Sequence, residues 1–173
     1  MERRDIMQEV DEIREWWEAR EGEGSEWYQK AYNHLKSIGI THVYDIGCSY
    51  GPYIGMALDM GLNYIGIDER ESVDMHNSKD TIMDYNVELR LNTKFPCVIN
   101  PQTNSAALSM FALGSLFQQD QIPEAMIQLK KEFKHFYVAT FREAAYIMRE
   151  YWDHAEWLPF DDFSNVVWHF WDD

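Results

Sequence analysis

Residues 42–53 read HVYDIGCSYGPY, and this stretch decides the fold. Its apolar run 43–46 is typical of a short buried strand, and the glycines that follow predict a tight turn. Pro52 suits the first position of a helix, where its missing N–H costs nothing. A strand that ends in glycines before a helix turns backbone N–H groups and the positive end of a helix dipole toward a ligand. The stretch therefore predicts a ligand site at the end of a strand.

A second short apolar run, residues 64–67, ends in the carboxylate of Asp68. In a β-α-β unit, an acid at the end of the second strand suits two adjacent ribose hydroxyls. The two runs together predict a nucleoside site.

From residue 39 onward, short apolar runs alternate with helix-length segments. The expected strands cover residues 42–46, 63–67, 81–86, 95–100, 135–141, 157–160 and 166–171. The expected helices cover about 52–60, 87–94, the small-residue run after the loop 102–105 up to Phe117, 121–133 and 142–153. For the third strand, residues 87–91 are the alternative; we favour 81–86, ending near Asp84, because it leaves a helix-length segment before the fourth strand.

The join at residues 161–165 is too short for a crossover helix, so we expect the last two strands to be antiparallel. Such alternation predicts an α/β fold: a three-layer Rossmann-like sandwich around a mostly parallel seven-stranded sheet, closed by an antiparallel C-terminal hairpin strand. Residues 5–20 and 25–38 have helical apolar stripes and predict N-terminal helices. We expect a single domain over 1–173, with a helical cap at 1–38 and the Rossmann-like core at 39–173.

Composition narrows the classes of function. The 173 residues include 15 basic and 30 acidic side chains, a formal charge of −15, which disfavours nucleic acid as a partner. The first twenty residues resemble no signal peptide, and no apolar run approaches the ~18 residues of a membrane span. The two cysteines, Cys48 and Cys97, predict reduced thiols rather than a disulfide framework, and no Cys/His spacing matches a metal site. We therefore expect a cytoplasmic protein that contacts no membrane.

Residues 36–173 resemble the class I (Rossmann-like) S-adenosylmethionine-dependent methyltransferases. The resemblance rests on residues 43–51, which are similar to motif I of that family, on Gly66-Ile67-Asp68, on Asp84 and on the closing antiparallel strand. It implies S-adenosyl-L-methionine as the cofactor and methyl transfer as the activity. Ser49 stands where the family has its middle glycine.

The resemblance also implies residue roles. It assigns the first turn to the methionine part of the cofactor, through Asp45, Gly47, Cys48, Ser49 and Gly51. It assigns Asp68 to both ribose hydroxyls. It assigns the Asp84 carboxylate and the N–H of Tyr85 to the adenine.

Candidate catalytic and substrate residues are fewer. The resemblance places Asn100 at the end of the fourth strand, where substrate-facing residues of the family lie, and Asn100-Pro101-Gln102-Thr103 is weakly similar to the (D/N/S)-P-P-(Y/F) motif of amino-group methyltransferases. His76 follows the second strand and is a second catalytic candidate. Trp27 or Tyr28 would line the acceptor pocket with Gln102, although aromatic residues on a helix most often serve packing.

The predicted function is methyl transfer to a small molecule or a protein side chain. The alternative is a catalytically degenerate methyltransferase fold whose acidic surface binds a basic protein partner. A third interpretation keeps the cofactor and cleaves it. The sequence does not name the acceptor or the oligomeric state.

Overall fold

Seven strands form one sheet in the order β3-β2-β1-β4-β5-β7-β6. The computed structural model describes residues 21–48, 51, 53–69, 86–110, 120–158 and 167–173. The strands are β1 (His42–Ile46), β2 (Asn63–Ile67), β3 (Val87–Arg90), β4 (Ser105–Ser109), β5 (His135–Ala139), β6 (His154–Trp157) and β7 (Val167–Trp171). Strands β1 to β5 pair in parallel, and β7 pairs antiparallel with both β5 and β6. The expected fold class, with its antiparallel closing strand, is confirmed.

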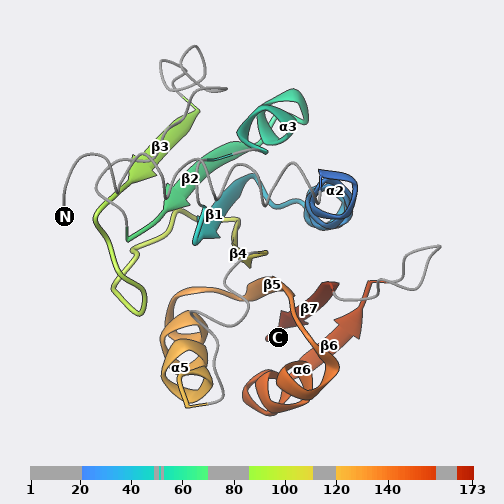
Figure 1. Cartoon of the computed structure of the whole chain (residues 1–173), viewed down its shortest axis with the longest axis vertical. Coiled ribbons are helices and arrows are strands. Elements are labelled where there is room, and N and C mark those ends of the chain that lie inside the picture. The colour runs from blue at the N-terminus through green and yellow to red at the C-terminus, as the bar shows by residue number, and fades with distance from the viewer. Residues whose placement is uncertain (1–20, 49–50, 52, 70–85, 111–119, 159–166) are drawn as a thin grey trace.

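The helices cover both faces of this sheet. They are α2 (Glu21–Ser37), α3 (Ile54–Asp59), α5 (Ile122–Glu132) and α6 (Arg142–Met148), which continues as the 3₁₀ turn η2 (Arg149–Tyr151). Figure 1 shows α2 and α3 on one side of the sheet and α5 and α6 on the other. Helix α2 begins at Glu21, four residues before the expected start at residue 25, and Gly39 (φ 89°) follows its end. The helix expected over 5–20 lies outside the described residues.

Two cores lie on the two faces. The α2-side core packs α2 and α3 on the sheet through residues such as Tyr28, Leu35, Val43, Ile54 and Leu108. The α5-side core packs α5 and α6 on the opposite face through residues such as Ile46, Met126, Leu129, Phe136 and Phe170. Alternate residues of the central strands β1, β4 and β5 enter opposite cores, as the period of a β-strand requires. Both faces of the sheet are therefore covered, which is the condition for a parallel sheet.

The third strand lies at Val87–Arg90. The alternative prediction, residues 87–91, is therefore confirmed, and the favoured prediction that this strand lies at 81–86 is wrong. It is an edge strand, and only its alternate residues Val87 and Leu89 pack against the α2-side core. Alternation of this kind is the signal of a half-buried strand. The helix expected over 87–94 does not form there.

The fourth strand is also displaced. It lies at Ser105–Ser109, in a stretch assigned to a loop and a helix, and the run 95–100 forms no strand. Small residues Ala106 and Ala107 fill the centre of the sheet between β1 and β5, where space is limited. Pro96 lacks the N–H that a central strand needs, which disfavours the earlier position. Asn100 and Gln102 consequently precede β4 instead of following it.

The prediction that the last two strands are antiparallel is confirmed, but β6 begins at His154 rather than at Trp157. Among the described residues, no helix combines the length and the apolar character needed to cross a membrane.

Candidate functional site

The candidate site lies where the chain leaves β1 and β4 at the carboxyl edge of the sheet. These two strands are neighbours, but the chain passes from β1 to α3 on one face and later from β5 to α6 on the other. In open α/β sheets, ligands bind at such a switch in strand order. The hydroxyl of Ser109, the last residue of β4, donates a hydrogen bond to the carbonyl of Ile46, the last residue of β1 (3.3 Å). This bond joins the two strand ends that border the site.

The turn after β1 is fixed to β2. Gly47 (φ 74°) and Gly51 (φ 70°) both adopt the left-handed conformation that favours glycine. The backbone N–H groups of Gly47 and Cys48 both donate to the carbonyl of Ile67, at 2.8 and 3.2 Å, and the N–H of Gly51 donates to the carbonyl of Cys48 (3.0 Å). The described N–H groups of the turn therefore stabilise the turn itself, and a ligand would meet its backbone surface.

Cys48 packs beneath this turn. Its side chain is fully buried, and a Cβ placed on Gly66 of β2 would lie 2.9 Å from its Sγ. The same Cβ would lie 3.1 Å from Leu89 and Tyr64 side-chain atoms. Gly66 thus supplies the space that the Cys48 side chain fills, and the contribution of Cys48 to the site is the position of the turn.

Asp45 is enclosed by tyrosines. The Tyr28 hydroxyl of α2 lies 3.1 and 2.9 Å from its two carboxylate oxygens, and the Tyr64 hydroxyl of β2 donates to Oδ2. Burial raises the pKa of Asp45 to about 7; the hydrogen bonds from Tyr64 and Tyr28 act in the opposite direction, and the nearby charge of Asp68 raises it further. Asp45 as a whole is only 1% exposed. In this arrangement Asp45 organises the site and presents no oxygen to solvent.

Asp68 follows β2 directly and is 8% exposed. Its N–H donates to the carbonyl of Arg90 (3.2 Å), and its carbonyl accepts from the N–H of Thr93 (2.9 Å), so the backbone on both sides of the residue is held by β3 and the turn after it. Asp45 of β1 pairs with Gly66 of β2, two residues before Asp68, and the charge of Asp68 raises the pKa of Asp45. The sequence-predicted acids of the first two strands are thus brought to one place.

The aromatic residues expected at an acceptor pocket lie in the α2-side core. Tyr28 is fully buried, and its ring stacks on Tyr53 with centroids 4.6 Å apart. Trp27 is 8% exposed, and its indole Nε1 has no hydrogen-bond partner in the described part of the chain. Tyr28 therefore joins α2 to Asp45, and the acceptor-pocket role of Trp27 or Tyr28 stays a prediction.

Asn100 and Gln102 require a correction. The N–H of Asn100 donates to the Glu132 carboxylate at the end of α5 (2.8 Å), and the N–H of Gln102 donates to the Tyr44 hydroxyl (2.9 Å). Because the chain reaches β4 only at Ser105, both residues lie before the amino end of that strand. The positional argument for a catalytic Asn100, that it ends the fourth strand, is therefore wrong, and the substrate role of Gln102 stays a prediction.

Four further candidates, Ser49, His76, Asp84 and Tyr85, lie outside the described residues. Because β3 begins at Val87, residues 84 and 85 precede it in the chain, and the argument that Asp84 closes the third strand no longer holds.

Sequence reasoning missed the residues that end β4 and follow β5. Ser109 and Thr140 are each 1% exposed, whereas Phe141, the residue before α6, is 67% exposed. Thr140 and Phe141 follow the buried strand β5 at the carboxyl edge. A polar residue directly after an apolar strand was the available signal, and the misplacement of the fourth strand hid the equivalent signal at Ser109.

No protein-family model and no curated protein sequence matches the chain. Solved structures do match it. A TehB-like S-adenosylmethionine-dependent methyltransferase from Corynebacterium glutamicum superimposes with a TM-score of 0.69 at 13% identity, over 96% of this chain and 99% of the other. The N-methyltransferase NodS from Bradyrhizobium japonicum gives 0.61 at 12% identity, over 84% and 96%. Monomeric WbdD gives 0.63 at 14% identity, over 84% of this chain but only 40% of the WbdD chain.

These matches and the strand order define the class: the chain has the class I Rossmann-like methyltransferase fold. At such identities the likeness concerns the fold. The residues present fit a nucleoside-containing cofactor at Asp68, a buried acid at the end of the second strand. The fit of such a cofactor is less direct at Asp45, because the carboxylate oxygens of Asp45 already accept hydrogen bonds from tyrosines.

Proposed function

We propose that the protein binds S-adenosylmethionine at the carboxyl edge of β1 and β2 and transfers its methyl group to a small molecule or a protein side chain. The observation that carries the proposal is the buried Asp68, placed at the end of β2 beside the glycine turn after β1. An acid at this position accepts hydrogen bonds from adjacent ribose hydroxyls. When bound, the cofactor supplies an electrophilic methyl group on a sulfonium.

The residues of this chain would contribute mainly by positioning. Methyl transfer from a sulfonium is an in-line displacement, and placing the acceptor and the methyl group together supplies much of the acceleration. Gly47 and Gly51 hold the turn in place, and Asp68 would fix the ribose. The edge residues Thr140 and Phe141 come from the strand on the far side of β4, and the exposed Phe141 ring is available to contact an acceptor.

The test is isothermal titration of the protein with S-adenosylhomocysteine and S-adenosylmethionine. We expect Asp68→Ala to weaken binding by on the order of 1–3 kcal/mol through the loss of hydrogen bonds to hydroxyls. Asp59→Ala is the matched control, because Asp59 is an exposed acid at the end of α3. A thermal unfolding curve for each variant verifies that it is folded at the temperature of the titration.

Absence of binding by the parent protein at high ligand concentration would contradict the proposed cofactor. Equal affinity of the parent and Asp68→Ala would contradict the ribose assignment alone.

A second function, a methyltransferase fold that only binds a basic protein partner, is favoured by two observations. The Asp45 carboxyl is closed off by Tyr28 and Tyr64, and the chain carries a formal charge of −15. Cofactor binding without turnover on any acceptor, combined with salt-sensitive binding to a basic protein, would favour this second function over the first.

A further inference from the structure

A histidine cluster lies on the α2-facing side of the sheet, away from Asp45. The paired residues Tyr137 of β5, His169 of β7 and Glu156 of β6 stand in one row across the three strands. Residues paired in this way project from the same face of a sheet. His34 of α2 reaches this row: its Nδ1 lies 2.6 Å from the Tyr137 hydroxyl, and its Nε2 lies 3.9 Å from a Glu156 carboxylate oxygen.

One nitrogen of His169 is buried and has no hydrogen-bond partner in the described part of the chain. The residue is 3% exposed, and its ring stacks on Tyr137 and Trp171 with centroid distances of 4.4 and 4.5 Å. Its Nε2 lies 3.0 Å from Nδ1 of His135, whereas its Nδ1 has no hydrogen-bond partner within the described residues. A buried polar atom without a partner is unfavourable and calls for an explanation.

We propose that His34, Glu156 and His169 bind a divalent transition-metal ion, with Zn²⁺ the ion that best suits the donors, and that this ion ties α2 to the antiparallel pair β6–β7. One ligand atom from each of the three residues lies within 4.8 Å of the other two. Two imidazoles and a carboxylate form a set that zinc accepts, with a further position left for water. The inference is independent of the proposed methyl transfer.

The surrounding contacts match what a metal-binding imidazole requires. A ligand histidine usually holds its second nitrogen in a hydrogen bond, which fixes the ring orientation. Here Tyr137 contacts Nδ1 of His34, so its Nε2 faces Glu156, and His135 contacts Nε2 of His169, so its Nδ1 has no hydrogen-bond partner among the described residues. Burial, together with the neighbouring His34 and His135, lowers the pKa of His169 to about 3, so the ring is neutral near pH 7 and its free nitrogen can bind a cation.

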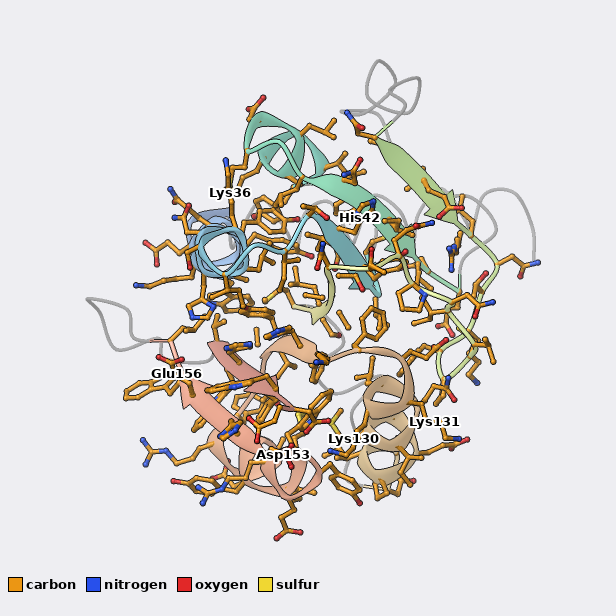
Figure 2. The ribbon with its side chains drawn as sticks, turned by 180° about the vertical axis from the view of Figure 1, so that it is seen from behind. Lys36, His42, Lys130, Lys131, Asp153 and Glu156 are labelled. Atoms are coloured by element: carbon orange, nitrogen blue, oxygen red, sulfur yellow. The ribbon has the colours of Figure 1, made fainter. Side chains whose placement is uncertain are left out.

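The ligands have room to close on an ion. Four-coordinate zinc with ligand distances of about 2.0–2.1 Å holds its ligand atoms about 3.3 Å apart. The side chains of His34 and Glu156 are 26% and 51% exposed, so both can rotate inward while His169 stays fixed by its stacked neighbours. Figure 2 shows Glu156 on the same side of the molecule as Lys36, which lies two residues after His34 on α2.

The position of the ion gives it a structural consequence. Tyr28 precedes His34 by six residues, or about 9 Å along the helix. The same helix that contacts Asp45 through Tyr28 would therefore be fastened to β6 and β7 through the ion. The strongly negative formal charge of the chain also favours a bound cation.

The experiment is a titration of the chelator-treated full chain with ZnCl₂ in competition with a chromogenic chelator, accompanied by the visible spectrum with Co²⁺. We expect one ion per chain and a four-coordinate cobalt spectrum. His34→Gln and Glu156→Gln should each lower zinc affinity by roughly tenfold or more, and Tyr137→Phe, which releases the His34 ring, by about 10–100-fold. At the same zinc concentration, zinc should raise the unfolding midpoint of the parent more than that of Glu156→Gln.

The matched control is His154→Gln. His154 lies on the same strand as Glu156 and pairs with Asp173 (2.7 Å), so it tests whether any histidine-acid pair of this strand binds zinc. Unchanged zinc affinity in His154→Gln supports the proposed site. Failure of the parent to bind, equal affinity in Glu156→Gln and parent, or a loss as large in His154→Gln would each overturn it. His34 and Glu156 are partly exposed, so neither conclusion depends on a variant of the buried His169.

Discussion

The two cores of this protein differ in chemistry. On the α5 side, the hydrophobic cluster is aliphatic and aromatic, and within that described cluster only Tyr44 and Trp152 carry a side-chain nitrogen or oxygen. On the α2 side, four buried tyrosines, Tyr28, Tyr32, Tyr64 and Tyr137, share the core with Cys48, and Asp45 and His169 face the same side. Buried polar groups are unfavourable unless they are satisfied, so they concentrate where a fold carries function. The α5-side cluster mainly stabilises the sheet, whereas the α2 side holds the buried Asp45 and the histidine cluster.

Asp45→Asn should produce the largest change in stability, because it removes the one carboxyl group that is buried among the tyrosines. The pKa of Asp45 is raised from 3.8 to about 7 in the folded protein. A raised carboxyl pKa stabilises the fold fully below the unfolded value, and this contribution is lost as the pH rises through about 7. The loss is on the order of 4 kcal/mol between about pH 3.5 and 8. For the Asp45→Asn variant, urea unfolding at several pH values should show a flatter decline of stability with pH.

Asp59→Asn is the control for that comparison, because it removes an equal charge from an exposed position. Parallel pH profiles for the parent and Asp45→Asn would show that Asp45 ionises normally in the fold.

Leu129→Ala tests the apolar core in the same way. Leu129 is fully buried between α5 and the sheet, and its truncation removes apolar contacts and leaves a cavity. We expect a loss of about 3 kcal/mol in the free energy of unfolding, with an unchanged denaturant slope. Affinity for S-adenosylhomocysteine should be unchanged at temperatures where the variant is folded. A loss of ligand affinity as large as the loss of stability would mean that the two sides are not separable.

Gly66→Ala gives a smaller effect on the α2 side. The added methyl group would meet Cys48 Sγ at 2.9 Å, so the turn after β1 must shift, at a cost of about 1–3 kcal/mol in stability. Gly55→Ala is the matched control: Gly55 lies within α3, no described atom stands within 4 Å of the added carbon, and the change should stabilise the protein by about 0.5–1 kcal/mol. Thermal unfolding of both variants measures the difference. Equal midpoints would show that Cys48 can move freely.

The sequence predicted the parts of this fold that are locally explicit. Strands β1, β2 and β5 are continuous buried runs bounded by turn residues, and they were placed correctly at their starts. The edge strand β3 alternates polar and apolar residues, and β4 is built from serine, alanine and leucine. Small residues of this kind are equally typical of a helix, and only the narrow space between β1 and β5 decides for a strand.

The candidate site also has residues that the sequence could predict and contacts that it could not. Asp45 and Asp68 could be predicted because each follows from one strand end. The enclosure of Asp45 depends on Tyr28, which reaches it from a helix 17 residues earlier in the chain, and no local pattern reports such a contact. The row formed by Tyr137, His169 and Glu156 depends on the register of β5, β7 and β6, which the positions of the strands alone do not specify.

The two hydrogen bonds that the Ile67 carbonyl accepts restrict the motion of the turn after β1. Since the amides of Gly47 and Cys48 both donate to this one oxygen at the end of β2, neither can exchange with solvent deuterium without the local separation of the turn from β2. The start of the turn therefore belongs to the slowly exchanging cooperative unit of the central sheet. A ligand that binds against it meets a surface already ordered by the sheet, so little conformational entropy is lost there on binding.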